Sequence, residues 1–369
     1  MKKTIFSILS LLTLVIFVSS CSSDDVSSES IFKTETQSMS EFDTWLYNNF
    51  TKPYNIEFRY RYQDSETSQS YNVIPADPEK SKALAILVRE LWIGAYEAVA
   101  GKEFIKTYGP KVYQLIGSPE FSSNESIVLG YAENGVKITL FRVNEIDTDN
   151  IYVNLEDAFR DHYAMPLDLN HWYFHTMHHE FCHILTQAKN YPTDFQTISA
   201  GNYHTADWVN VKDEEAPLEG FVTGYASGEY NEDFAEVFST YVTSNDKVWG
   251  QILQKARKVT GSQTKLDADG NPVYKLDADG NRIIKDYIYD QDGNKLIIMG
   301  DDGKLYYAVE YEVETENTYD DTYYDIILQK LDIVRDYMKD SWGISLDALR
   351  EEVLKRTENV YNLDLKTLN

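Results

Sequence analysis

The run from His179 to His183, His-Glu-Phe-Cys-His, restricts what this chain can fold into more than any other feature. Two histidines four residues apart lie on one face of an α-helix. From that face, both imidazoles can reach one Zn²⁺ at roughly 2.0–2.1 Å. The pattern predicts that this helix spans Leu169 to Ala188. Glu180 flanks the same face, so it is predicted to be a general base that takes a proton from an attacking water.

A third metal ligand is predicted on a later helix. The metzincin pattern is absent, because Thr186 and Lys189 stand where that pattern needs Gly and His. A helix is predicted from Asn231 to Ser244, and its apolar residues indicate that it is buried. Buried carboxylates need a partner. We therefore predict Glu232 as the third zinc ligand and Glu236 as the acceptor of a hydrogen bond from a ligand histidine.

Alternatives to this assignment stay open on the sequence alone. His204, a loop residue 21 positions after His183, could be the third ligand or a substrate-binding residue. The histidines could instead be buried in an amphipathic helix, and Glu232 could belong to a solvated acidic face. Cys182 points away from the metal face and is predicted to be a small core residue. It has no evident partners for a cysteine peptidase.

A tyrosine precedes the second ligand helix. Tyr225 lies seven residues before Glu232. Together with the His179 motif, this spacing resembles the gluzincin arrangement of anthrax lethal factor. The resemblance implies that Tyr225 can donate its phenol to the oxyanion formed when a peptide bond is attacked. Since the chain contains 28 tyrosines, a packing role for Tyr225 is the alternative.

Short blocks along most of the chain resemble one family more closely. They are Glu41-Phe-Asp-Thr-Trp-Leu46, Lys52-Pro-Tyr-Asn-Ile56, the His179 motif, the segment from Glu232 to Glu236, Trp342-Gly-Ile and Leu349-Arg350. Together they look like the family of substrate import-associated zinc metallohydrolase lipoproteins. The resemblance implies a zinc peptidase on a lipid anchor, working with a TonB-dependent nutrient import complex.

The first 20 residues are predicted to be a secretory signal peptide. Lys2 and Lys3 precede an apolar stretch from Ile5 to Val18. The Ser-Ser-Cys21 that follows resembles the lipobox of bacterial lipoproteins, which implies that Cys21 is lipidated. An ordinary signal peptide or a short membrane anchor is the alternative. Residues 21–38 are predicted to be a flexible, lipid-anchored tether. Its acidic start resembles surface-export signals, which implies an outer-membrane lipoprotein exposed on the cell surface.

Charge and cysteine content limit the binding partners, the membrane attachment and the disulfides that are possible. The net charge of −26 argues against a nucleic-acid partner, because phosphate binding needs clustered Lys and Arg. No segment after the signal peptide approaches the roughly 20 apolar residues of a membrane span. The lipid at Cys21 is therefore the predicted membrane attachment. With Cys21 lipidated, only Cys182 remains and no disulfide can form.

The remaining pattern predicts an α+β, zincin-like metallopeptidase domain over residues 39–369. Helices are expected at Ser40–Phe50, Pro78–Ala100, Tyr323–Tyr337 and Leu346–Asn359, and strands at Asn55–Tyr62, Val112–Ile116, Ser126–Tyr131 and Val136–Val143. We expect the last strand to be the sheet edge on which an extended peptide docks by strand addition.

An internal repeat follows the second ligand helix. Lys265-Leu-Asp-Ala-Asp-Gly-Asn271 recurs at 275–281, with weaker copies at 290–294 and 301–303. Asp-Gly-Asn is a turn signal, so we predict a β-hairpin insertion over residues 262–312. Calcium binding is the alternative, since Asp-x-Asp-Gly-Asn starts like an EF-hand loop. However, position 12 of that loop is Ala278 or Ile288, and neither side chain can bind a cation.

These features predict a zinc-dependent metallopeptidase with one Zn²⁺ per chain and a peptide or protein substrate. Two other functions stay open. The first is a non-catalytic lipoprotein that captures substrate for a transporter, which the intact Glu180 argues against. The second is a zinc hydrolase that cuts a non-peptide amide, which no sequence feature excludes.

Overall fold

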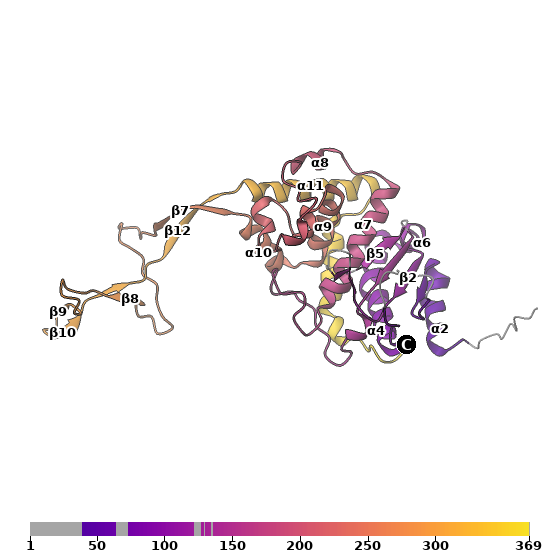
Figure 1. Ribbon diagram of the computed structural model, residues 1–369, viewed down its shortest axis with the longest axis horizontal. Helices are drawn as coiled ribbons and strands as arrows, with labels where there is room; N and C mark the ends of the chain where they lie inside the picture. The colour runs from indigo at the N-terminus through magenta and orange to yellow at the C-terminus, as the bar shows by residue number, and fades with distance from the viewer. Residues whose placement is uncertain (1–38, 64–72, 122–126, 129, 134–135, 369) are drawn as a thin grey trace, which may run out of the picture. The chain divides into compact units, whose positions relative to one another are not determined.

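The computed structural model describes residues 39–63, 73–121, 127–128, 130–133 and 136–368. The fold below is that of the compact unit from Glu41 to Asn369 (Figure 1). The predicted signal peptide, Cys21 and the tether 21–38 lie outside the described residues, so their roles stay predictions. Across the described residues, no helix is both long enough and apolar enough to span a bilayer.

Helices dominate the first part of the unit. Their bounds are α2 (Glu41–Leu46), η1 (Tyr47–Thr51), α3 (Lys52–Tyr54), α4 (Pro78–Leu87), η3 (Val88–Ile93), α5 (Gly94–Ala100) and α6 (Lys102–Tyr108). The helix predicted from Pro78 to Ala100 is confirmed as the succession of α4, η3 and α5, with a π-helical middle. Asp77 begins it, because its carboxylate accepts hydrogen bonds from the backbone of Glu79 and Lys80.

A four-stranded sheet has the order β1-β2-β6-β5. β1 (Glu57–Arg59), β2 (Val112–Leu115) and β6 (Lys137–Leu140) are parallel, and β5 (Gly130–Glu133) is antiparallel to β6. The prediction that the strand at 136–143 is the edge is wrong, because β6 is paired on both sides. All four β6 residues are buried, as expected for an interior strand. The edge next to β6 is β5.

The strand predicted from 126 to 131 is divided. β4 (Ile127–Val128) pairs with β3 (Glu120–Phe121) in a separate two-stranded sheet. Gly130 starts β5, so only the end of the predicted strand belongs to the main sheet. Residues 126 and 129 lie outside the described residues.

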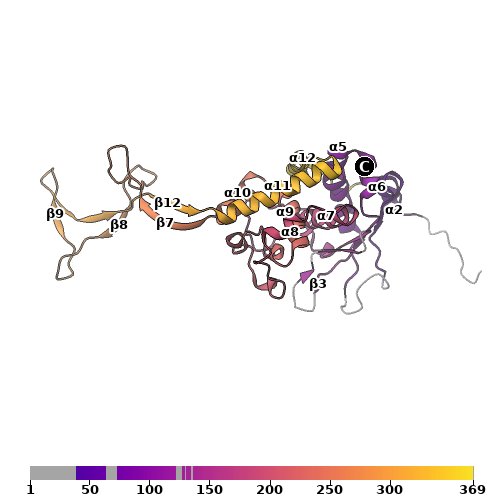
Figure 2. The same ribbon diagram turned by 90° about the horizontal axis from the view of Figure 1, so that it is seen from above.

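The helices of the second half carry the predicted site. α7 (Thr176–Ala188) continues the π-helical η5 (Asn170–His175), and α9 (Tyr230–Thr243) packs against α7, so both predicted ligand helices are confirmed. The other elements are η4 (Val143–Glu145), α8 (Asp194–Ile198), η6 (Trp208–Asn210), η7 (Ala216–Glu219), η8 (Tyr225–Ser227), α10 (Asp246–Lys255), α11 (Thr322–Trp342), α12 (Leu346–Glu358) and η9 (Val360–Asn362). Figure 2 shows α11 alongside α9, on which it packs.

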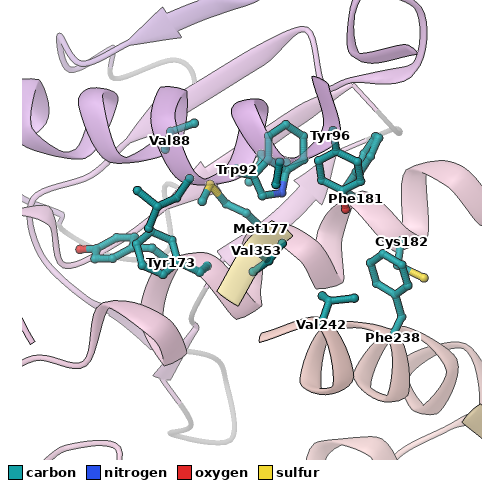
Figure 3. Close-up of a cluster of buried hydrophobic side chains, with 14 of the residues drawn as sticks. Val88, Trp92, Tyr96, Tyr173, Met177, Phe181, Cys182, Phe238, Val242 and Val353 are labelled. Carbon is teal, nitrogen blue, oxygen red and sulfur yellow. The ribbon is translucent and has the colours of Figure 1, made fainter. Parts of the chain in front are cut away.

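Aromatic side chains hold α7 in place. Phe181 on α7 meets Trp92 and Tyr96 edge-on, with ring centroids 5.1 and 5.0 Å apart (Figure 3). Such T-shaped pairs are a favoured arrangement of aromatic rings. The next residue, Cys182, is buried in the same core, as predicted for it (Figure 3). Close packing on both sides fixes the rotation of α7, and with it the face that carries the histidines.

Between α10 and α11 the chain forms a β ribbon, which we call the arm (Lys258–Asp320). β7 (Lys258–Thr264) pairs with β12 (Thr315–Asp320), β8 (Ile284–Tyr287) with β11 (Val309–Tyr311), and β9 (Ile297–Met299) with β10 (Leu305–Tyr307), all antiparallel. Figures 1 and 2 show the ribbon continuing from the ends of α10 and α11. The paired strands run beyond the predicted insertion, 262–312, at both ends.

Each Asp-x-Asp-Gly-Asn repeat forms a tight turn on the arm. In the first, Asp267 Oδ1 accepts hydrogen bonds from the backbone N–H groups of Asp269 and Asn271, at 2.9 and 2.8 Å. Gly270 has a φ of +83°, a left-handed conformation that favours glycine. The other two repeats bind their own turns in the same way. Calcium binding, the alternative to a plain hairpin, stays untested, and among the described residues no three arm carboxylates have ligand atoms within 4.8 Å of one another.

Candidate metal centre

Two helices bring three ligand atoms together. His179 Nε2 and His183 Nε2, both on α7, lie 3.0 Å apart. Glu232 Oε2 on α9 lies 2.9 Å from His179 Nε2 and 3.2 Å from His183 Nε2. Within the part of the chain that the structure describes, this is the one group of three His, Cys, Asp or Glu side chains close enough to hold a metal ion.

The spacing of these atoms fits a tetrahedral zinc ion. With ligands at roughly 2.0–2.1 Å from the ion, neighbouring ligand atoms of a tetrahedron are roughly 3.4 Å apart. The three observed separations, 2.9, 3.0 and 3.2 Å, are close to that value. Two imidazole nitrogens and one carboxylate oxygen also form a donor set typical of catalytic zinc, which keeps a fourth position open. The residues present therefore fit one zinc ion.

Glu236 lies behind His179, one helical turn after Glu232. Its Oε1 is 2.7 Å from His179 Nδ1, and its Oε2 accepts a hydrogen bond of 2.6 Å from Thr223 Oγ1. A carboxylate on Nδ1 orients the imidazole and directs its Nε2 toward a metal. Glu236 also lies 3.4 Å from His175 Nε2, which itself contacts Ser239 Oγ at 3.0 Å. The position is the one that the sequence predicted for Glu236.

These contacts set the charge of the site. Burial lowers the pKa of His179, but Glu232 and Glu236 outweigh it and hold that pKa well above its usual value. Burial raises the pKa of Glu232, but His179 and His183 outweigh it and hold that pKa well below its usual value. The pKa of Glu236 is also well below its usual value, because His175 and His179 outweigh burial. Both carboxylates are therefore ionised at neutral pH, as metal binding requires.

Comparison with known proteins assigns the chain to a family. Residues 35–347 match the family described as "Putative zinc-binding metallo-peptidase". The chain belongs to this family. A crystal structure from Bacteroides caccae ATCC 43185, described in the same words, matches with a TM-score of 0.59 and 31% sequence identity; the match covers 92% of this chain and 100% of that one. No curated protein matches the sequence.

In this member of the zinc-binding metallo-peptidase family, Glu180 and Tyr225 lie beside the three ligand atoms. The Tyr225 ring centroid is 5.6 Å from that of His179 and 4.8 Å from that of Trp208, which packs edge-on. Burial raises the pKa of Tyr225, and the adjacent Glu232 raises it further. Tyr225 therefore keeps its proton and can donate a hydrogen bond. The structure brings both predicted catalytic residues to the ligand group.

Two cavities meet at this centre. The α10 cavity, of about 560 Å³, lies among α7, α9, α10 and the loop 154–168. The α8 cavity, of about 660 Å³, is lined by α7 and the segment 186–196. Both are lined by Gly130, His179, Glu180 and Tyr225. The ligand atoms therefore stand where an extended substrate could pass from one cavity to the other.

The edge strand β5 passes this junction. A Cβ at Gly130 would lie 2.7 Å from Thr176 Cγ2 on α7 and 2.9 Å from the carbonyl oxygen of Thr139. Only glycine lets β5 approach α7 this closely. The side of β5 that pairs with no other described strand therefore lies near Glu180, which lines the same two cavities as Gly130.

The structure does not bring His204 to the ligand group. Its Nε2 lies 2.7 Å from Glu219 Oε2, and it lines neither cavity. A pairing between a loop residue and the last residue of the short helix η7 accounts for its position. Such a pairing carries no sequence signal, because the loop around His204 has no periodic pattern.

Sequence reasoning missed residues of the α10 cavity. His162 Nε2 lies 2.7 Å from Asp213 Oδ2, and its ring stacks on that of His171 with centroids 3.6 Å apart. His171 lies two four-residue steps before His179, so helical spacing could have found it. His162 and Asp213 lie in loops, where no spacing predicts a position.

Proposed function

We propose that this chain is a zinc-dependent peptidase that holds one zinc ion with His179, His183 and Glu232. The convergence of one Nε2 from each histidine and Oε2 of the glutamate, at 2.9 to 3.2 Å from one another, carries the proposal. Membership of a zinc-binding metallo-peptidase family supports the identity of the metal. The contact of Glu236 with His179 Nδ1 supports a ring held for coordination through Nε2.

Each side chain of the site then has its own role in peptide hydrolysis. Zinc, when bound, supplies a Lewis acid that makes a water more acidic and polarises the scissile carbonyl. Glu180 takes a proton from the attacking water and passes it to the leaving amine. Tyr225 donates its phenolic hydrogen to the oxyanion that develops on the carbonyl. Glu236, backed by Thr223, keeps His179 in its orientation.

The edge of β5, which pairs with no further strand among the described residues, is the proposed docking strand for an extended peptide, in place of β6. Main-chain groups of an incoming strand would pair with this edge. Because Gly130 lines both cavities, a peptide on the edge of β5 would present a bond to the ligand group. The side chains that flank that bond would enter the α10 and α8 cavities.

Metal content and cleavage, measured on the same samples, test this function. We expect wild type to carry about one zinc per chain by mass spectrometry and to cleave a broad peptide library. Glu232→Ala should lose both zinc and cleavage. Glu180→Gln should keep zinc and lose about 10²- to 10⁴-fold in rate, the usual contribution of a general base. Glu215→Ala removes an exposed carboxylate outside both cavities and should change neither.

Each contrary result points to a different error. Zinc that survives Glu232→Ala would place the third ligand elsewhere. A zinc-loaded wild type that cuts no peptide would favour substrate capture for a transporter, or a non-peptide amide as substrate. Glycopeptides and other amides in the same assay separate these two. Wild type without zinc would overturn the proposal.

A location at the outer surface of the cell is the second part of the proposal. Lipidation of Cys21 would anchor the peptidase in the outer membrane, next to a TonB-dependent import complex. The lipobox-like Ser-Ser-Cys21 and the acidic start of the tether support it. The intact mass of the protein from its native membrane should show a lipid that Cys21→Ser lacks, and external protease should digest it on whole cells. Unlipidated wild type, or protection from the protease, would contradict this location.

A further inference from the structure

The α10 cavity is lined by acids, and none of the residues lining it is Lys or Arg. Its carboxylates other than Glu180 are Asp157, Asp168, Asp213 and Glu236. Aromatic and aliphatic side chains, among them Trp172, Trp208 and Ile252, form much of the remaining wall. A cavity of this kind suits a ligand with an apolar stem and a positive end.

Most of the buried negative charge around the cavity is already paired. Asp213 faces His162 at 2.7 Å and accepts the backbone N–H of Gly224. Glu236 is held by histidines and by Thr223. Neither group is therefore left to recognise a ligand.

Asp168 is 4% exposed, about as buried as Glu236, but unlike Asp213 and Glu236 it forms no ion pair with any described residue. Its Oδ1 accepts the backbone N–H groups of Asn154 and Asn170 at 2.9 and 3.0 Å. Its Oδ2 makes no hydrogen bond to the residues that the structure describes. Asp168 lines the cavity, and a largely buried carboxylate with one oxygen unpaired costs free energy that a cation would offset.

The nearest arginine does not fill this role. Arg160 donates to the carbonyl oxygens of Ala164 and Pro166 and stacks on the ring of Tyr152 at 4.7 Å. It is also absent from the cavity lining. Burial raises the pKa of Asp168, although the two N–H donors, Arg160 and His162 lower it. The charge of the ionised Asp168 carboxylate is thus not fully offset by the groups around it.

The imidazoles of the cavity do not form an anion site. His162 is paired with Asp213, and His175 with Glu236. Burial lowers the pKa of His171 well below its usual value, and His162 and His175 lower it further, so His171 is neutral. The stacked rings of His162 and His171 therefore offer a flat face. Such a face suits an alkyl chain or a planar guanidinium group.

We infer that the α10 cavity accepts a long cationic side chain of the substrate, arginine or lysine, and that Asp168 is the carboxylate that pairs with its charge. The inference rests on the proposed function, since it places that side chain next to the scissile bond. The aromatic wall covers the aliphatic stem, and Asp168 Oδ2 receives the N–H donor. Asp168 is then a specificity-determining residue of a peptidase that cuts beside basic residues.

Peptides that differ at one position test the inference. After the library has located the scissile bond, four peptides carry Arg, Lys, norleucine or Glu at the preferred flanking position. We expect kcat/KM for the Arg and Lys peptides to exceed that for norleucine by about 10- to 100-fold, as for a hydrogen bond to a charged group. Asp168→Asn should bring this ratio close to one and leave the norleucine peptide almost unchanged.

Asp147→Asn is the matched control. Asp147 Oδ1 also accepts two backbone N–H groups, from Asp149 and Asn150, but it does not line the cavity. This variant should keep the wild-type ratio of Arg to norleucine. Loss of the ratio in both variants would assign the effect to general disturbance of the loops, and would overturn the role of Asp168.

A binding measurement separates this inference from the proposed function. In the Glu180→Gln background, calorimetry should show tighter binding of the Arg peptide than of the norleucine peptide, and Asp168→Asn should remove the difference. Such binding without any cleavage by wild type would reject the peptidase and keep the cavity assignment. Cleavage with an aliphatic, aromatic or acidic preference, or an Arg preference that survives Asp168→Asn, would reject the assignment and keep the peptidase.

Discussion

The metal centre and the arm both contain ordered pairs of opposite charge, but the pairs lie in opposite environments. Behind the metal centre, Lys330 Nζ lies 2.6 Å from Asp233 Oδ2, and both side chains are fully buried. On the arm, Lys275 Nζ lies 2.9 Å from Glu312 Oε2, and those side chains are 51% and 37% exposed. Water screens the second pair and not the first. The two ion pairs have similar lengths, but they contribute very differently to the stability of the fold.

The buried pair joins the segments that build the metal centre. Asp233 follows Glu232, the proposed zinc ligand, on α9, and Lys330 lies on α11. Lys330 Nζ also donates to the carbonyl oxygen of Gly220 at 2.8 Å, in the segment that leads to Tyr225. The pair thus fixes α9 relative to this segment. Arm pairs such as Lys275 with Glu312 join only two strands of the ribbon.

The largest predicted effect comes from breaking the buried pair. Lys330→Met leaves the Asp233 carboxylate buried without a cation, and should lower the free energy of unfolding by about 3–5 kcal/mol. Lys275→Met on the arm should produce no measurable change, because its partner stays in water. Denaturant unfolding of the two variants beside wild type measures both.

A double variant checks the cause. Lys330→Met combined with Asp233→Leu removes both charges, and should recover most of the lost stability, since a well-packed apolar pair can replace a buried ion pair. If Lys330→Met and Lys275→Met lowered stability equally, the contrast between the two regions would be wrong.

A smaller effect concerns pH. His178 is buried among aromatic rings, and its Nδ1 lies 2.8 Å from the hydroxyl of Tyr96. Burial, helped by His175, lowers the pKa of His178 from 6.5 to about 3. Below pH 6.5 the His178 imidazole binds a proton in the unfolded chain but stays neutral in the folded chain. Stability should therefore fall as pH drops from 6.5 toward 3, by up to roughly 1.4 kcal/mol per pH unit from this group.

One variant in each region tests whether His178 causes this fall in stability with pH. His178→Phe with Tyr96→Phe removes the titrating ring and its buried partner together, and should flatten the curve of unfolding free energy between pH 4 and 6.5. Asp277→Asn on the arm should leave that interval unchanged, because its own backbone turn lowers the pKa of this exposed carboxylate below its usual value. A slope that persists in the double variant would show that groups other than His178 cause it, and would contradict this prediction.

The two regions also differ in how far the sequence predicts them. The ligand helices follow from spacing, because His179 and His183 must share a face of α7 and Glu232 and Glu236 a face of α9. The arm turns follow from Asp-Gly pairs, because Gly270 adopts a conformation set by its immediate neighbours. Both are local features, and a local pattern is sufficient to predict them.

Features that depend on distant contacts could not be predicted in this way. The edge position of β5 depends on which strands pair, and alternation within 136–143 carries no information on that. Asp168 and Asp213 reach the α10 cavity from loops whose paths are set by packing. The sequence therefore predicted the grouping of His179, His183 and Glu232 better than the cavity beside it.

The smallest predicted effect comes from removing the arm. Ser262 and Asn317 face each other across β7 and β12, so a two-residue Asn-Gly turn can replace residues 263–316 and keep the register. None of the described residues from 258 to 320 belongs to the main hydrophobic core cluster, although Ala308 is itself buried. We therefore expect the shortened chain to keep the melting temperature of wild type within a few degrees, and to bind zinc as wild type does.

The result would decide whether the arm serves folding or recognition. Met299 and Leu305, paired on β9 and β10, are 71% and 67% exposed, so their removal takes no buried apolar surface from the body. Zinc content, thermal unfolding and cleavage of short peptides should all survive the excision. A large loss of stability would mean that the arm supports α10 and α11. Loss of activity on folded protein substrates alone would mean that the arm acts on the substrate, at a distance from a metal centre that folds without it.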